Sequence, residues 1–144
     1  MSILVINGAN LNMLGIREPG IYGNQTYQDL VDLIRKYCEG KGVTVDFYQS
    51  NHEGDLVNAV HNAWRAQIKG IVLNAGAYTH TSIALLDAIK ATSIPTVEVH
   101  ITKVEERESF RQVSYIKEAC IATVSGKGLN GYLEAVDILL EHIK

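Results

Sequence analysis

Apolar and polar positions alternate along the chain with two different periods. Short apolar runs rich in Val and Ile are typical of buried strands, and the segments between them carry apolar residues at helical spacing. The expected strands cover residues 3–6, 43–48, 70–73, 96–99 and 120–124. The expected helices cover residues 26–39, 55–67, 82–91 and a last stretch from about residue 130. Thr26 and Asp29 suit the N-cap and N3 positions of the first helix.

The alternation of strands and helices predicts the α/β class and a single domain over residues 1–144. We expect three layers, with a doubly wound, parallel five-stranded sheet between two layers of helices. At this chain length the pattern favours the flavodoxin-like strand order 2-1-3-4-5, in which strands one, three and four are neighbours. Open sheets of this kind bind ligands beyond the carboxyl ends of their strands, here between strands one and three.

The connection after the first strand, residues 7–23, is polar, rich in glycine, and carries Arg17 and Tyr22. Turn chemistry explains some of its Asn and Gly residues. The connection is longer than a usual strand-to-helix loop, which indicates a functional lid. A phosphate cradle is weakly supported, because GANLNMLG matches neither GxGxxG nor GxxxxGK[ST]. An Arg five residues before a Tyr can shift the acidity of the phenol.

Polar side chains also follow the third and fourth strands. The third strand leads into residues 74–81, which include His80, and the fourth ends in Glu98, His100 and Thr102. Because Glu98 and His100 alternate along a strand, they lie on the same side, where a carboxylate can fix the tautomer of an imidazole. We therefore expect acid–base chemistry here. Arg111 comes after this cluster, and its guanidinium suits carboxylate or polyol ligands.

A metal site is an alternative use of the same side chains. His80, Glu98 and His100 would supply the pattern of two histidines and one carboxylate. The chain has no HExxH or similar ligand spacing, and its arginines would crowd a cation. Acid–base use without a metal is therefore favoured.

Composition and charge narrow the class of protein. The chain is 47% hydrophobic and 20% charged with a net charge of −3, which fits a globular domain and gives no support for a nucleic-acid-binding surface. No apolar run is long enough to span a bilayer, and no signal peptide is recognisable, so we expect a cytoplasmic protein without membrane partners. Cys38 and Cys120 lie in apolar segments, where two reduced core thiols are expected.

Several segments together carry a specific resemblance. They are GANLNMLGIREPGIYG, YQSNHEGDLVNAVH, LNAGAYTHTSIALLDAI, and VEVHIT followed by ERESFR and SY. In this order they resemble the type II 3-dehydroquinate dehydratases, over nearly the whole chain as far as GKGLNGY. The resemblance implies a cofactor-free lyase of the shikimate pathway, or of quinate breakdown, that removes water from 3-dehydroquinate to give 3-dehydroshikimate. It also implies a flavodoxin-like fold and a homo-oligomer, a dodecamer of four trimers.

The resemblance further implies the catalytic roles. Tyr22 is the general base, which takes a proton from C2 of the substrate as a phenolate. Bringing a phenol from a pKa of ~10 to near neutrality needs roughly 4 kcal/mol of differential stabilisation, and Arg17 is the partner for that task. The enolate is held through a water near Asn10. His100 is the general acid that protonates the departing C1 hydroxyl, and Glu98 sets its orientation.

The remaining matched positions bind the substrate. Asn74 aligns with the group that contacts the leaving hydroxyl. The backbone of Ile101 and Thr102, with the Thr102 hydroxyl, aligns with the turn that binds the carboxylate. His80 and Arg111 align with residues that hold the ring hydroxyls.

The resemblance also concerns subunit contacts. Asp87 matches a residue that reaches the active site of a neighbouring subunit, so a complete site would need the trimer. The chain departs from the family pattern in its loops and contact surfaces, at Ala9, Ala75, Leu86, Lys103, Glu105, Gln112 and Val113. These departures bear on subunit contacts and lid docking, and every catalytic role stays occupied.

Two other functions remain in view. A flavodoxin-like ligand-binding module would show a phosphate loop or an acidic receiver pocket where this chain has Arg17, Tyr22 and His100. A metal-dependent hydrolase would use His80, Glu98 and His100 as ligands.

Overall fold

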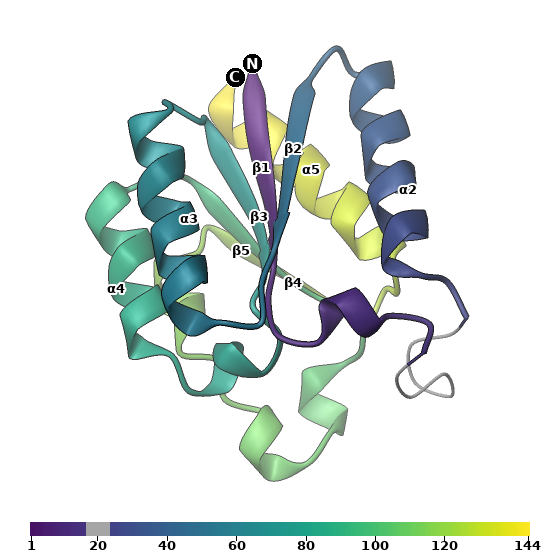
Figure 1. The fold of residues 1–144 in the computed structure, drawn as a ribbon, viewed down its shortest axis with the longest axis vertical. Helices are drawn as coiled ribbons and strands as arrows, with labels where there is room; N and C mark the ends of the chain where they lie inside the picture. The colour runs from purple at the N-terminus through teal and green to yellow at the C-terminus, as the bar shows by residue number, and fades with distance from the viewer. Residues whose placement is uncertain (17–23) are drawn as a thin grey trace.

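The computed structural model describes residues 1–16 and 24–144 and holds one five-stranded parallel sheet (Figure 1). The strands are β1 (Ser2–Asn7), β2 (Thr44–Gln49), β3 (Gly70–Asn74), β4 (Thr96–His100) and β5 (Ala122–Ser125). Their order is β2-β1-β3-β4-β5, and every neighbouring pair is parallel. The predicted α/β class and strand order are therefore confirmed.

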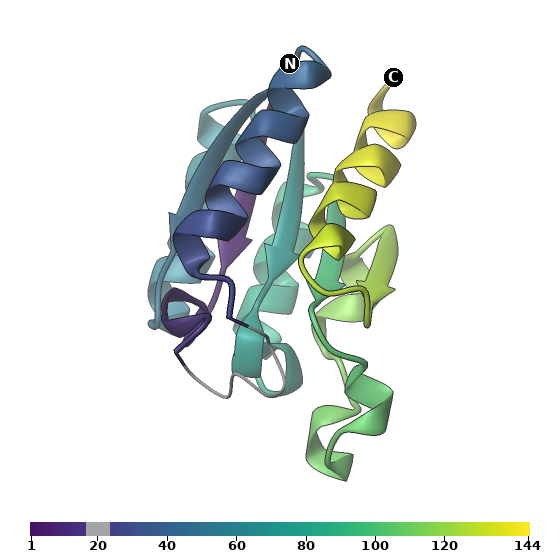
Figure 2. The same ribbon diagram turned by 90° about the vertical axis from the view of Figure 1, so that its right-hand side faces the viewer.

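Helices cover both faces of the sheet (Figure 1), and Figure 2 looks onto one of these faces, with its two helices in front of the strands. They are α2 (Tyr27–Gly40), α3 (Glu53–Arg65), α4 (Ile83–Thr92) and α5 (Asn130–Ile143). One apolar cluster joins α2 and α5 to the sheet through residues such as Ile34 and Val136. A second cluster joins α3 and α4 to the other face through residues such as Val60 and Leu85. The three predicted layers follow from these two clusters.

The ends of the helices follow local signals only in part. Thr26 caps α2 as predicted, because its hydroxyl accepts from the Asp29 backbone N–H at 3.1 Å and the Asp29 carboxylate accepts from the Thr26 N–H at 2.9 Å. Helix α3 begins at Glu53, two residues earlier than predicted, after His52 as N-cap.

Within the described ranges, no helix combines the length and hydropathy needed to cross a bilayer.

The short helical turns between the regular elements were not predicted. They are η1 (Leu11–Met13), η2 (Gly76–His80), η3 (Val104–Glu106), η4 (Ser109–Arg111) and η5 (Ile116–Ala119). A single turn is too short to show helical periodicity in a sequence. The last of them precedes β5, which begins at Ala122, so Cys120 lies before the strand and is partly exposed, whereas Cys38 is fully buried.

Glycine allows the loops after β1 and β3 to pack backbone against backbone. The Gly8 N–H donates to the Asn74 carbonyl at 2.7 Å, and a Cβ atom at Gly8 would overlap the Ala75 carbonyl group. Gly76 adopts φ +62°, a left-handed conformation that favours glycine, with the Ala9 backbone against it. The two loops therefore meet closely at the carboxyl end of the sheet.

Candidate active site

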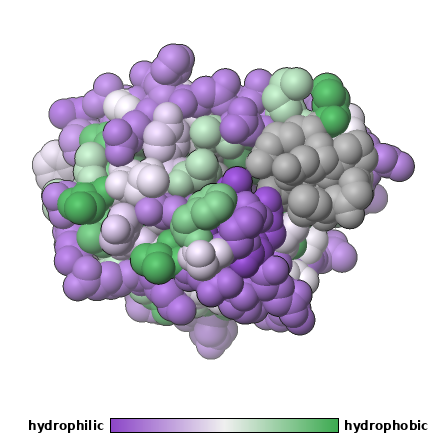
Figure 3. All heavy atoms as spheres, turned by 90° about the horizontal axis from the view of Figure 1, so that it is seen from below, coloured by the Kyte–Doolittle hydropathy of each residue, from purple (hydrophilic) through white to green (hydrophobic). Residues whose placement is uncertain are grey.

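A pocket lies at the carboxyl ends of β1, β3 and β4, where the predicted clusters meet. Its wall also includes the segment from Val104 to Arg111. Figure 3 looks at this end of the molecule, whose surface is mostly hydrophilic with separate hydrophobic spots. The predicted site residues that line the pocket are Asn10, Asn74, His80, His100, Ile101, Thr102 and Arg111.

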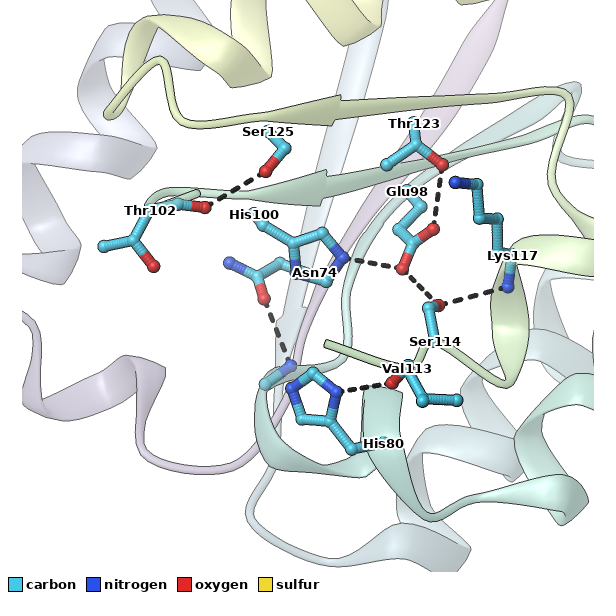
Figure 4. A network of polar contacts seen from close by, with 11 residues as sticks. Asn74, His80, Glu98, His100, Thr102, Val113, Ser114, Lys117, Thr123 and Ser125 are labelled. Atoms are coloured by element: carbon cyan, nitrogen blue, oxygen red, sulfur yellow. Dashed lines mark hydrogen bonds and ion pairs between the residues drawn. The ribbon is translucent and has the colours of Figure 1, made fainter. Parts of the chain in front are cut away.

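Glu98 and His100 form a buried pair on β4 (Figure 4). Their side chains are 0% and 7% exposed, and His100 Nε2 lies 2.6 Å from Glu98 Oε2. An ionised carboxylate only accepts, so Nε2 carries a hydrogen and donates it to Glu98. The proton that His100 can exchange with a ligand is then the one on Nδ1. This contact is the one expected from the alternation of the two residues along a strand.

Two hydroxyl groups also donate to the Glu98 carboxylate, one to the oxygen that His100 contacts and one to the other oxygen. Ser114 donates to Oε2 at 2.5 Å, and Thr123 on β5 donates to Oε1 at 2.9 Å. Burial by itself raises the pKa of Glu98, but the hydrogen bond and charge of His100 and the two hydroxyl donors outweigh it, so the pKa lies below its ordinary value. The carboxylate therefore stays ionised beside His100.

Sequence reasoning missed Ser114 and Thr123. Thr123 is the register partner of Glu98 in the β4–β5 pair, so the strand order with a register would have indicated it. Ser114 lies in an irregular segment without periodic signal.

The Cys120 thiol lies near the same carboxylate. Burial and the charge of Glu98 raise the pKa of this thiol to about 12, so it stays protonated.

Replacing Ser114 by alanine is expected to lower the free energy of unfolding by about 1–2 kcal/mol at neutral pH, because a buried carboxylate loses a donor. The pKa of Glu98 is lowered in the folded state, so its contribution to stability is present above the ordinary pKa of a glutamate and is lost as the pH falls through the folded-state pKa. Urea unfolding at a series of pH values measures the difference, which should shrink toward acid. Ser109→Ala in η4 is the control, and a difference independent of pH would contradict the contact's role.

His80 ends η2, and its ring is fixed by a backbone carbonyl. Nδ1 donates to the Val113 carbonyl oxygen at 2.7 Å, which leaves Nε2 as the exchangeable nitrogen (Figure 4). The backbone N–H of Tyr115 also donates to the Thr79 carbonyl at 2.9 Å. These bonds attach the segment around residue 113 to the loop after β3.

Two arginines bring positive charge to the pocket wall. Arg111 Nε donates to Glu108 at 2.8 Å, and this bond lowers the pKa of the Glu108 carboxyl. Arg107 Nη1 lies 3.4 Å from the Thr102 hydroxyl. Arg107 also lies in the pocket wall.

The segment after β2 supports the loop that carries Asn10. Asn10 adopts φ 71°, and its backbone N–H donates to Asn51 Oδ1 at 2.9 Å. Gln49 Nε2 lies 3.1 Å from the same oxygen and 3.2 Å from the Gly8 carbonyl. Tyr78 donates to the Asn51 carbonyl at 2.7 Å. Gln49 and Asn51 belong to the motif YQSN, and Tyr78 belongs to GAYTH. Nothing in the spacing of these motifs indicates which groups the three side chains contact.

Other predicted residues are not brought into the pocket. Asp87 is exposed on α4 and is absent from the pocket lining. Arg17 and Tyr22 lie outside the described residues. Within the ranges 1–16 and 24–144, no three His, Cys, Asp or Glu side chains form a group that could hold a metal, so His80 does not join Glu98 and His100 as the metal alternative requires.

Comparisons with known proteins agree on one family. A family model described as dehydroquinase class II matches residues 1–140. A 3-dehydroquinate dehydratase 1 of Corynebacterium efficiens is 56% identical over 137 residues, 95% of this chain and 90% of the relative. A 3-dehydroquinate dehydratase of Fusobacterium nucleatum is 53% identical over 144 residues, 99% of this chain and 98% of the relative. The crystal structure of a type II dehydroquinase from Butyrivibrio crossotus has a TM-score of 0.96 and 50% identity, covering 97% of each chain.

Proposed function

The chain belongs to the dehydroquinase class II family, and from this premise we propose that its pocket converts 3-dehydroquinate to 3-dehydroshikimate by elimination of water. The observation that carries the proposal is the buried Glu98–His100 pair, which opens onto a pocket lined by Arg107 and Arg111. Such a pocket offers a proton donor and cationic groups to a ligand that bears a carboxylate and hydroxyls. The reaction serves the shikimate pathway or quinate breakdown.

Removal of the C2 proton begins the reaction. The base is Tyr22, with Arg17 favouring its phenolate form, and both assignments rest on the motif GIREPGIYG because these residues lie outside the described ranges. The ketone beside C2 makes the proton acidic, since the charge moves to the carbonyl oxygen as an enolate. A water held near Asn10 stabilises that oxygen. The hydrogen bond from the Asn10 backbone N–H to the Asn51 side chain supports a fixed position for Asn10.

Loss of the C1 hydroxyl completes the reaction. Protonated His100 delivers a proton from Nδ1 to the hydroxyl, which leaves as water while the enolate electrons form the C1–C2 double bond. The ionised Glu98 carboxylate stabilises the imidazolium before transfer and keeps the ring in one orientation. The substrate thus loses the C2 proton and the C1 hydroxyl, which together make up the one water molecule that is eliminated.

Substrate binding uses the turn after β4. Ile101 and Thr102 bind the carboxylate, His80 and Arg111 hold the ring hydroxyls, and Asn74 contacts the leaving hydroxyl. The turn is supported from β5 and the residues after it, because Ser125 Oγ donates to the Thr102 carbonyl at 3.2 Å and the Gly128 N–H donates to the Ile101 carbonyl at 3.0 Å. The fixed carbonyl groups support a fixed position for the N–H groups of the same turn.

The active unit is a trimer within a dodecamer, in which Asp87 approaches a neighbouring subunit's pocket. The exposed position of Asp87 on α4, away from the pocket of its own chain, supports this role. Ile83, on the same helix, is 58% exposed and adds apolar surface. Leu86, by contrast, packs into the core beneath α4.

The growth of enone absorbance tests the function. We expect purified protein to raise this absorbance with 3-dehydroquinate, because the product conjugates its new double bond with the ketone, and we expect a chelator to leave the rate unchanged. His61→Gln, on α3 and away from the pocket, is the control for histidine replacement. Absence of any absorbance change would overturn the dehydratase proposal, and loss of activity with chelator would instead favour a metal-dependent enzyme.

A further inference from the structure

A buried tyrosine connects the ends of β1 and β3 beneath the pocket. Tyr132 on α5 is 0% exposed, and its hydroxyl lies between the amide side chains of Asn7 and Asn74. These two asparagines are register partners at the last positions of β1 and β3. Asn74 lines the pocket, whereas Asn7 and Tyr132 are absent from its lining.

The hydrogen bonds around this hydroxyl have one consistent direction. The Gly76 backbone N–H can only donate, and it donates to Asn74 Oδ1 at 3.1 Å. The other end of that amide, Nδ2, therefore donates to the Tyr132 oxygen at 2.8 Å. The Tyr132 hydroxyl donates its single hydrogen to Asn7 Oδ1 at 2.6 Å. Gly76 and Tyr132 thus hold opposite ends of the Asn74 amide.

An asparagine amide can exchange its donating and accepting ends by a half-turn about its last side-chain bond. With Oδ1 and one Nδ2 hydrogen engaged, the second Nδ2 hydrogen is the group that Asn74 can offer to a ligand oxygen. Burial raises the pKa of Tyr132 above its ordinary value, so the hydroxyl keeps the hydrogen that this arrangement requires.

We propose that Tyr132 is a positioning residue that fixes the orientation of the Asn74 amide and thereby presents its free N–H to the leaving hydroxyl of the substrate. The inference rests on the proposed contact between Asn74 and that hydroxyl. Tyr132 itself touches no substrate. Its hydroxyl acts through Asn74, and its ring packs in the core between α5 and the sheet.

Tyr132→Phe keeps the ring and removes both hydrogen bonds. We expect kcat to fall about ten- to a hundredfold, because a reacting group that is misplaced by a small distance loses rates of this order. KM should change less than kcat. Tyr37→Phe is the matched control, since it removes a tyrosine hydroxyl bonded to Asp137 on α5 at 2.7 Å, outside the pocket. Urea unfolding of both variants reports the structural cost separately.

A double-mutant cycle identifies the path of the effect. In an Asn74→Ala background, Tyr132→Phe should cause no further loss of kcat, because its effect passes through the missing amide. The inference would be overturned if the loss of kcat in the double variant equalled the product of the losses in the two single variants. A kcat for Tyr132→Phe equal to that of Tyr37→Phe would also overturn it. An unimpaired Asn74→Ala variant would overturn it as well, while an inactive native protein would overturn the proposed function itself.

A second variant covers the case in which Tyr132→Phe does not fold. Asn7→Ala removes the acceptor of the Tyr132 hydrogen and leaves the pocket lining unchanged. The Tyr132 hydroxyl can then point its hydrogen toward Asn74. In that orientation it no longer fixes Nδ2 of the Asn74 amide as the donor. We expect a smaller loss of kcat, again absent in the Asn74→Ala background, and a loss that persists there would count against the role of Tyr132.

Discussion

Replacement of His100 by glutamine is expected to lower kcat about 10²- to 10⁴-fold, the range over which a positioned proton donor contributes to rate. Glutamine can still donate a hydrogen bond to Glu98, so the buried carboxylate keeps a partner. It has no group that can release a proton to a hydroxyl at neutral pH. Steady-state measurement of enone formation gives kcat and KM together.

The binding of substrate should survive this change, because the turn at Ile101 and Thr102 and the arginines of the wall are untouched. His61→Gln serves as the control and should retain native kcat. A His100→Gln variant with a kcat close to that of the control would exclude His100 as the acid. A large rise in KM at constant kcat would assign it to binding instead.

Replacement of Tyr22 by phenylalanine is expected to abolish measurable turnover, with kcat at least about 10²- to 10⁴-fold lower. In the proposed mechanism this variant lacks the phenolate oxygen that removes the C2 proton, and it retains the ring. Calorimetric titration with the substrate should then show that binding is retained, since the proposed contacts to the carboxylate and ring hydroxyls come from other residues.

The matched control for Tyr22 is Tyr48→Phe, because Tyr48 is 37% exposed on the edge strand β2 and lies outside the pocket lining. Native turnover is expected for this variant. Near-normal kcat in Tyr22→Phe would rule out the assigned base. Deuterium at C2 provides a further check, because its exchange with solvent should be lost together with turnover.

The fold was predictable because its signals are local and repeated. The strands follow short runs rich in Val and Ile, most plainly in the buried residues of β3 and β4, and each helix has an apolar face. The capping pair Thr26 and Asp29 fixed the start of α2 within a single turn. The strand order then followed from the preferences of doubly wound sheets.

Part of the pocket was predictable because the carboxyl ends of parallel strands share one edge of a sheet. The alternation of Glu98 and His100 indicated a contact that the structure shows at 2.6 Å. Motif resemblance supplied Asn10 and Asn74, whose chemistry alone would also fit ordinary turns. The roles of these residues stay predictions for the experiments above.

The supporting residues could not be predicted because their partners are distant in sequence and follow no period. Ser114 reaches Glu98 from an irregular segment, and Tyr132 reaches Asn74 from a helix whose apolar face explains a buried tyrosine without any polar partner. Asn51 reaches Asn10 from a different loop. Only the assembled sheet brings these groups together.

In the proposed mechanism His100 protonates the departing hydroxyl, and a change of leaving group separates this role from any other. A substrate analogue with fluoride at C1 has a leaving group that departs with little need of a proton. For His100→Gln we expect a loss of kcat of about 10²- to 10⁴-fold with 3-dehydroquinate, and a loss of less than about tenfold with this analogue. An equal loss with hydroxyl and fluoride would contradict the claim, because the missing function would then not be proton donation.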